Sequence, residues 1–350
     1  MSQKSRKQKG RNKKSARQLF LRKKRIVITV FSFLMILIVA AGGLAVKVMA
    51  DVAKSMDRMY QEVSTIDMRN SSIEVDDPVE KERPKQPEKE ESAVTKEDLI
   101  SNAKPMAMLL IGTDTGDFGR TAVNGLSDTL IYVVLNPGKQ RMSLLSIPRD
   151  SYVEIYGTGT WTKINAAYSY GGAELCINTV QQLLQLPVDA YAVVNFAGFQ
   201  NVIDVIGGVT VENAFTFSWD GYTFPEGTVT LNGKEALAFC RMRKNDPEGD
   251  FGRSRRQRNV IVAVAKKATT LAGALNYQEL LDAVSGNVLT NVDMSMAMDM
   301  ITRYSPCLNN VINYDTLTGY GFSNNGWYYQ LDEDNLARVR AELRAELELD

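Results

Sequence analysis

Histidine is absent from this 350-residue chain. Its absence excludes the Ser-His-Asp triad, the Cys-His pair, phosphohistidine transfer and the HExxH zinc site, because each of these needs an imidazole. The chain also lacks a GxxxxGK[ST] sequence, the loop that cradles nucleotide phosphates in many NTPases. The chemistry that remains open depends on carboxylates, arginines and metal ions.

Cysteine is scarce as well. The three cysteines, Cys176, Cys240 and Cys307, are far apart in the sequence and each has apolar neighbours. An odd number of cysteines in such surroundings predicts buried free thiols rather than a disulfide framework. A domain without disulfides must be stabilised by its own hydrophobic core, and this chain is long enough to form one.

Charge is unevenly distributed, although the formal net charge is zero. Residues 1–25 hold 12 Lys and Arg and no acid, and residues 26–46 carry no charge. An apolar run of that length can cross a bilayer as a helix, and the basic block before it favours a cytoplasmic N-terminus in contact with membrane lipid. The sequence therefore predicts a single-pass cell-membrane protein whose C-terminal part is extracellular. A cleaved signal peptide is the alternative interpretation.

Residues 47–103 are predicted to connect this anchor to the folded part. Apolar residues at heptad spacing indicate a juxtamembrane helix, through which a weak homodimer is an open alternative. These residues are Val52, Met56, Met59, Val63 and Ile66. Residues 76–91 contain three prolines and mostly charged residues, so they predict a solvated stalk.

Residues 104–330 predict one extracellular domain of the α/β class (mixed α+β), with a central mixed sheet flanked by helices on both faces. Strands are expected at 106–112, 129–135, 141–147, 188–196 and 209–212, with a tight hairpin at 136–139. Helices are expected at 173–186, 199–206 and 254–274, the last with Ser254 as its N-cap. A charged helix at 331–350 closes the chain.

Residues 241–258, RMRKNDPEGDFGRSRRQR, hold seven basic and three acidic side chains, and six of the basic ones are arginine. Guanidinium groups bind phosphate bidentately, so this preference indicates phosphate recognition. If Arg241 and Arg243 belong to an extended segment, both point to one face while Met242 packs on the other. Arg255, Arg256 and Arg258 would then lie in the first turns of the next helix, whose N-terminus favours anions. A solvated charged helix start is the alternative.

Acidic residues border the predicted strands. Asp114 follows the first strand and Asp128 precedes the second, positions at which two carboxylates could hold Mg²⁺ against phosphate oxygens. Arg149 and Asp150 follow the third strand and are expected at the same edge. Turn or cap chemistry explains such aspartates equally well.

Several segments, taken in order, resemble the LytR-CpsA-Psr (LCP) family over residues 106–267. They include LLIGTDTGDFGRT, LLSIPRDSYV, KINAAYSYGG, LNGKEALAFCRMRK and DPEGDFGRSRRQR. The resemblance implies an enzyme that moves a glycopolymer, of the teichoic acid or capsular polysaccharide type, from a polyprenyl-pyrophosphate carrier to peptidoglycan. It also implies an apolar pocket for the prenyl chain and Mg²⁺ (or Mn²⁺) as cofactor.

The resemblance assigns roles to particular residues. Metal ligands would be Asp114 and Asp128. Catalytic residues would be Asp128, Arg149, Arg241 and Arg243. Pyrophosphate would contact Arg241, Arg243 and Gln257. Arg149 matches the arginine of the family's PRD segment, and we expect it, Arg255 at the helix start and Arg120 to bind pyrophosphate as well. The chain departs from the family pattern in having Leu126 where an arginine is frequent, which Arg120 would replace, and Ala166 where a histidine is frequent.

Three rival functions stay open. One is a non-catalytic module that binds wall polymer or lipid, and another is a hydrolase that releases the glycopolymer to water. A transcriptional regulator is disfavoured, because the part beyond residue 46 is net acidic, is expected outside the cytoplasm and shows no helix-turn-helix pattern. No nucleic acid is therefore expected as a partner.

Overall fold

The computed structural model describes residues 58–69, 94–114, 125–244, 246–271, 286–314 and 317–349. Across these ranges, no helix has both the length and the apolar composition that a membrane crossing requires. The predicted basic tail, anchor helix and stalk, at residues 1–25, 26–46 and 76–91, lie outside the described residues.

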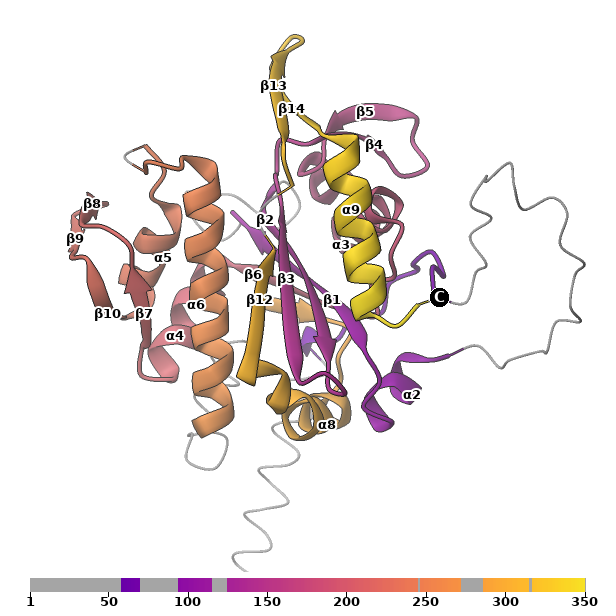
Figure 1. Cartoon of the computed structure of the whole chain (residues 1–350), viewed down its shortest axis with the longest axis horizontal. Helices are drawn as coiled ribbons and strands as arrows, with labels where there is room; N and C mark the ends of the chain where they lie inside the picture. Colours follow the sequence, from indigo (N-terminus) through magenta and orange to yellow (C-terminus); the bar gives the residue numbers. More distant parts are fainter. Residues whose placement is uncertain are drawn as a thin grey trace, which may run out of the picture. The chain divides into compact units, whose positions relative to one another are not determined.

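A six-stranded mixed sheet forms the centre of the fold, in the order β11-β6-β1-β2-β3-β12 (Figure 1). Its strands are β1 (Met106–Thr113), β2 (Ser127–Asn136), β3 (Arg141–Ile147), β6 (Ala190–Asn195), β11 (Val288–Thr290) and β12 (Asn310–Tyr314). β2 is antiparallel to β1 and β3, whereas β6 runs parallel to β1 and β12 parallel to β3. The predicted mixed sheet is therefore confirmed.

The expected hairpin between β2 and β3 is present at residues 136–141. Asn136 pairs with Arg141, the Asn136 Oδ1 accepts a hydrogen bond from the Lys139 N–H at 2.9 Å, and Gln140 has φ 47°. Asn, Pro and Gly promote such a turn through their own backbone preferences and side-chain hydrogen bonds. Local sequence alone therefore determines this connection.

Side chains of β2 alternate between two cores, one on each face of the sheet. Tyr132 and Val134 pack with α3 (Ala166–Leu184) and α9 (Glu333–Glu346), while Ile131 and Val133 face the opposite core. That second core includes α2 (Lys96–Ser101), α8 (Met294–Tyr304) and residues of α6 (Asp250–Leu271). Helices on both faces explain why β2 is apolar along most of its length rather than alternating.

A third apolar cluster lies beyond α6. It joins α4 (Phe196–Val205) and α5 (Gly233–Arg241) to two small hairpins, β7 (Val209–Asn213) with β10 (Gly227–Leu231) and β8 (Phe217–Trp219) with β9 (Tyr222–Phe224). Val260 of α6 belongs to this cluster, while Ile261 and Val262 face the second core. α6 therefore packs between two cores (Figure 1).

Two further hairpins lie beyond the central sheet, next to each other. The first pairs β4 (Tyr152–Ile155) with β5 (Thr160–Lys163), and the second pairs β13 (Gly319–Ser323) with β14 (Trp327–Leu331). They meet where the Tyr329 N–H donates to the Asp150 carbonyl at 2.9 Å. The C-terminal helix α9 is charged on its exposed side but buries Leu336, Val339 and Leu343 in the first core.

Three local predictions differ from the structure. The long helix begins at Asp250 rather than after Ser254, which lies inside it and is buried. Arg241 is the last residue of α5, so it is helical, and Met242 is the non-helical residue that caps this helix. The helix predicted at 199–206 begins three residues earlier, where Asn195 caps α4 by accepting from the Gly198 N–H.

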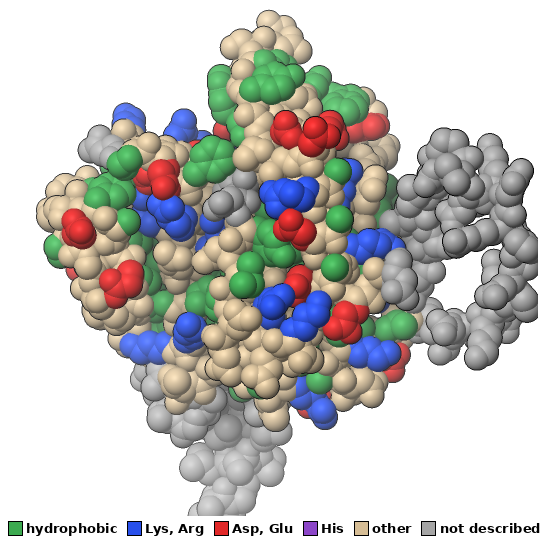
Figure 2. Space-filling view, viewed as in Figure 1, with side chains coloured by type: hydrophobic (Ala, Val, Ile, Leu, Met, Phe, Trp, Pro, Cys, Tyr) green, Lys and Arg blue, Asp and Glu red, His purple; other side chains and the backbone are tan. Residues whose placement is uncertain are grey.

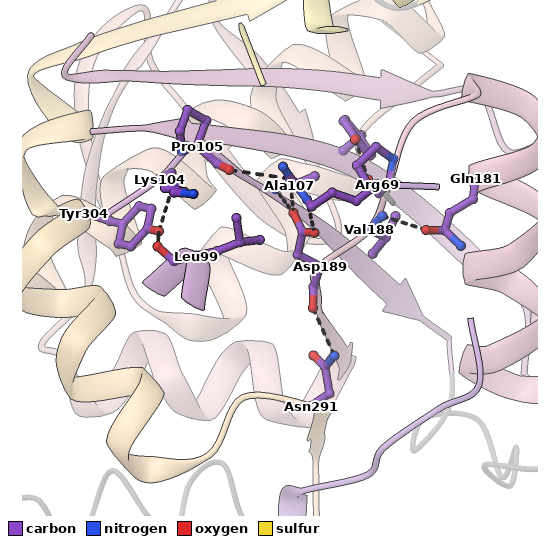
Figure 3. A network of polar contacts seen from close by, with 12 residues as sticks. Arg69, Leu99, Lys104, Pro105, Ala107, Gln181, Val188, Asp189, Asn291 and Tyr304 are labelled. Atoms are coloured by element: carbon purple, nitrogen blue, oxygen red, sulfur yellow. Dashed lines mark hydrogen bonds and ion pairs between the residues drawn. The ribbon is translucent and has the colours of Figure 1, made fainter. Parts of the chain in front are cut away.

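The predicted juxtamembrane helix is wrong from Tyr60 onward. Residues 61–67 are not helical, and they contact the domain. We call residues 58–69 the strap. The Ile66 N–H donates to Asn178 Oδ1 at 2.9 Å, and Arg69 forms a bidentate ion pair with Asp189 at 2.8 and 2.7 Å (Figure 3). Val63 and Ile66 are apolar because they contact the domain, so their heptad spacing does not indicate a helix here.

All three cysteines are free and buried, as predicted. Burial raises the pKa of the Cys176 thiol to about 12 and that of Cys240 to about 12. These thiols therefore stay protonated at neutral pH and behave as small apolar side chains.

Candidate active site

The ends of three neighbouring strands bring Asp114, Asp128 and Arg149 to one edge of the sheet. Asp114 directly follows β1, Asp128 is the second residue of β2, and Arg149 comes two residues after β3. Because β2 is antiparallel to both neighbours, its first residues lie beside the last residues of β1 and β3.

Asp114 is buried and holds the start of β2 in place. Its Oδ1 accepts from the Leu126 N–H at 2.9 Å, and its own N–H donates to the Leu126 carbonyl at 3.4 Å. Both contacts use the backbone of Leu126. Leucine in place of the family's arginine therefore leaves the position of Asp114 unchanged.

Charges of alternating sign run along this edge. Arg149 Nη1 donates to Asp128 Oδ1 at 2.8 Å, and its Nε lies 3.7 Å from Asp150 Oδ2. Lys163 on β5 donates to Asp150 Oδ1 at 2.6 Å. These contacts link the sheet edge to the β4–β5 hairpin.

A second group of charges lies at the start of α6. Asp250 Oδ2 accepts from Arg253 Nη2 at 2.9 Å, and Asp250 Oδ1 lies 3.7 Å from Arg243 Nε. The two groups interact electrostatically. Asp250 raises the pKa of Arg149, and Arg149 lowers the pKa of Arg253. The sequence prediction missed Arg253 because it started the helix too late. With the helix starting at Asp250, Arg253 lies one turn before Gln257.

Burial and neighbouring charges shift the pKa of two arginines in opposite directions. Burial disfavours the charged form of Arg149, but the carboxylates of Asp128, Asp150 and Asp250 outweigh that effect and raise its pKa. Burial lowers the pKa of Arg253, and the nearby guanidinium groups add to this effect. The Nε atoms of both arginines are buried without a hydrogen-bond acceptor among the described residues. An anion that binds beside such a buried N–H group can accept the hydrogen bond that the group lacks.

Arg256 and Arg258 point into the protein instead. Arg256 forms an ion pair with Asp246, donates to the Phe239 carbonyl at 3.0 Å and lies over the Phe217 ring. Arg258 donates to Ser146 Oγ on β3 at 2.7 Å. The expectation that both would contribute to an anion site at the helix start is wrong. They fasten α6 to its neighbours and so position the arginines that do face the site.

An apolar pocket of about 320 Å³ opens beside the charged edge. Its walls come from β1, α4, α5 and α6, and include Leu110, Phe199, Ile203, Leu237, Ile261 and Val264. Arg241 and Gln257 also line it, as does Thr129, the residue after Asp128. Arg241 lies over the Phe196 ring, with 5.4 Å from its guanidinium carbon to the ring centre, and its Nη1 is 3.8 Å from Asp220. The pocket is therefore apolar along its walls and polar at the charged edge.

Three other residues were predicted to bind pyrophosphate, namely Arg243, Arg255 and Arg120. Arg243 is exposed beside Asp250, and Arg255 is exposed in an ion pair with Glu248. Two residues along a helix correspond to about 200° of rotation, so Arg255 points away from the face that carries Gln257. Arg120 lies outside the described residues.

Asp114 and Asp128 are the carboxylates at the strand ends that could hold a metal ion. Mg²⁺ is commonly held by one or two carboxylates together with phosphate oxygens and water. Asp114 and Asp128 provide that set at the strand edge, and the ranges that the structure describes contain no cluster of three or more His, Cys, Asp or Glu for a metal. A metal held by this pair alone would need phosphate oxygens or water as its other ligands.

The comparisons with known proteins match this architecture. The model of the LytR_cpsA_psr family matches residues 63–345, so the chain belongs to this family. The match begins within the strap, includes both core faces and the charged edge, and ends within α9.

Curated relatives cover nearly the whole chain. The polyisoprenyl-teichoic acid–peptidoglycan teichoic acid transferase TagU of Enterococcus faecalis is 37% identical over 325 residues, 93% of this chain and 98% of that protein. TagU of Bacillus subtilis is 35% identical over 328 residues, 93% and 97% of the two chains. The crystal structure of B. subtilis TagU superposes with a TM-score of 0.58 at 38% identity, covering 71% of this chain and 98% of that one.

Proposed function

We propose that this protein transfers a glycopolymer of the teichoic acid class from a polyprenyl-pyrophosphate carrier to peptidoglycan. The observation that carries the proposal is the junction of an apolar pocket with an arginine-rich edge, at Arg241 and Gln257. A prenyl pyrophosphate has the same two parts, an apolar chain and a doubly phosphorylated head. The transferase names of the relatives support the assignment.

The pocket suits the prenyl chain, since its walls are almost entirely aliphatic and aromatic. Burial of apolar surface contributes roughly 25 cal/mol per Å², so even part of the chain would contribute several kcal/mol to binding. The pyrophosphate would then lie against Arg241, Arg149 and Arg253. Guanidinium forks match phosphate oxygens bidentately, which fixes the orientation of the head.

Charge neutralisation is the main catalytic contribution that we assign to the chain. A sugar hydroxyl of peptidoglycan attacks the phosphorus on the glycopolymer side, the bond to the bridging oxygen breaks, and prenyl phosphate leaves. Arg149, Arg241 and Arg253 stabilise the charge on the leaving phosphate. Asp128 and Asp150 are the carboxylates at this edge that could accept the hydroxyl proton.

Asp114 and Asp128 would hold Mg²⁺ or Mn²⁺ in this site. When bound, the metal neutralises phosphate charge and orients the pyrophosphate. Arg149 contacts Asp128 directly, with 2.8 Å between Nη1 and Oδ1, so it keeps this carboxylate at the strand edge in the absence of substrate.

The cell membrane is the proposed location, with an N-terminal anchor at residues 26–46 and the folded part outside. The reason is the uncharged run and the basic block before it. An anchored enzyme meets its lipid-borne donor in two dimensions.

A transfer assay tests the proposal. The full-length protein, a synthetic prenyl-pyrophosphate glycan, Mg²⁺ and peptidoglycan should yield prenyl phosphate and labelled peptidoglycan. Release of prenyl phosphate without labelling would assign hydrolysis instead. Binding of the donor without any release would assign a non-catalytic module.

A further inference from the structure

A group of aromatic side chains, one exposed and three half-buried, joins the β4–β5 and β13–β14 hairpins. Tyr152 contacts Trp161, Phe322 and Tyr328, with ring centres 5.5, 5.3 and 5.1 Å apart, and Phe322 stacks on Tyr328 at 5.6 Å. We call these four residues the aromatic platform. Trp161 is 55% exposed, and apolar side chains gather over β13–β14 at the top of Figure 2.

The platform is continuous with the catalytic edge. Lys163 Nζ lies 5.8 Å from the centre of the Tyr328 ring and donates to Asp150 Oδ1 at 2.6 Å. Asp150 in turn neighbours Arg149, and its carbonyl accepts from the Tyr329 N–H. A ligand that covers the platform would therefore extend towards the reacting phosphate.

Polar side chains accompany the exposed rings. Glu154 is paired with Trp161 across the β4–β5 hairpin, and Gln330 is paired with Tyr320, which is 64% exposed, across β13–β14. Cross-strand partners project to the same face, so each exposed ring has a hydrogen-bonding group beside it. A pyranose ring has C–H groups on its faces and hydroxyls around its rim. It can stack on an aromatic face, which is electron-rich, while its hydroxyls bond to neighbouring polar groups.

We propose that the aromatic platform binds the glycan strand of the peptidoglycan acceptor. This inference rests on the transferase function proposed above and names where its acceptor binds. The charges of the β13–β14 hairpin disfavour an anionic lipid surface as the occupant. Residues 317–331 contain no Lys or Arg, and Asp332, Glu333 and Asp334 directly follow β14. Interfacial segments usually combine aromatic residues with cations.

Replacement of Trp161 provides the kinetic test, using the full-length protein. Trp161→Ala should raise the KM for soluble, uncross-linked glycan strands about tenfold, as expected for loss of one aromatic anchor. The kcat and the KM for the prenyl-pyrophosphate donor should stay unchanged, and Trp161→Phe should restore most of the acceptor affinity. Unchanged acceptor KM in Trp161→Ala would overturn the proposal.

Trp327→Ala is the matched control. Trp327 lies on the other face of the β13–β14 hairpin, is 51% exposed and stacks on Tyr329. It should leave the acceptor KM unchanged. An equal rise in both variants would mean that the two hairpins act only through their stability, and the platform assignment would be wrong.

Fluorescence distinguishes a glycan from a membrane. Soluble glycan strands should shift the tryptophan emission of the wild type but not of Trp161→Phe. Quenching of the wild type by brominated lipids in nanodiscs, lost in Trp161→Phe, would show that the membrane covers the platform and would overturn the proposal. If the wild type releases no prenyl phosphate at all, the proposed function fails, whereas normal release with an unchanged acceptor KM in Trp161→Ala refutes only the glycan site.

Discussion

Replacement of Arg241 separates catalysis from folding. The Arg241 side chain is 35% exposed, its Nη1 lies 3.8 Å from Asp220 Oδ2, and its guanidinium lies over the Phe196 ring. A partly exposed pair of this kind contributes below about 1 kcal/mol. We therefore expect Arg241→Ala to unfold within a few degrees of the wild type, since about 1 kcal/mol corresponds to roughly 2–4 °C in a domain of this size.

The expected catalytic loss is much larger. An arginine on a transferring phosphoryl group can contribute ~10³-fold or more, so Arg241→Ala should lower kcat/KM for the donor by about 10²–10³-fold, or ~3–4 kcal/mol. Arg241→Lys keeps the charge but loses the planar fork, and should recover only part of the rate.

The assay is release of prenyl phosphate, with thermal unfolding measured on the same samples. Arg255→Ala is the control, since Arg255 belongs to the same arginine segment but points away from the pocket-lining face; it should stay within about threefold of wild type. Equal losses in Arg241→Ala and Arg255→Ala, or full activity in Arg241→Ala, would refute the reasoning.

Four further predictions concern stability and the pocket. Arg256→Ala should lower the free energy of unfolding by about 3–5 kcal/mol, measured by urea denaturation, because it leaves a buried carboxylate unpaired; replacing that carboxylate as well should recover part of the loss. Burial raises the pKa of Cys176 and Cys240 above that of an unfolded thiol, so their contribution to the free energy of unfolding is complete below about pH 9 and lost as pH rises towards 12. In urea denaturation, a Cys176→Ala, Cys240→Ala variant should lose less of its free energy of unfolding than the wild type over that pH range. An equal loss in both proteins would contradict the assignment. Arg69→Ala should release the strap and speed its proteolysis, whereas the core should resist cleavage as before. Ala265→Trp should fill the pocket and raise the KM for long-chain donors more than for short-chain ones; equal effects would place the chain elsewhere.

The strands could be predicted because their signals are local. The β2–β3 hairpin depends on Asn136, Pro137 and Gly138, and the apolar runs on either side have the length of buried strands. The strap could not be predicted in the same way. Val63 and Ile66 fit a heptad, but Asn178 and Asp189, far away in sequence, bind this segment in a non-helical form.

The residue types of the site could be predicted from the sequence, but the direction in which each arginine points could not. Arg241 and Gln257, to which the resemblance assigns contacts with pyrophosphate, line the pocket, whereas Arg256 and Arg258 belong to the interior. Their sequence neighbourhood is equally basic, and only the packing of α6 between two cores decides which of them face solvent. The early start of α6 also places Arg253 at the site, which composition alone did not show.

A crystal structure with a non-hydrolysable prenyl-pyrophosphate analogue tests the central claim most directly. We expect the prenyl chain to lie between α4, α5 and α6, with pyrophosphate oxygens within hydrogen-bond distance of Arg149, Arg241 and Gln257. A prenyl chain bound outside this pocket, or a pyrophosphate that contacts none of these three residues, would contradict it.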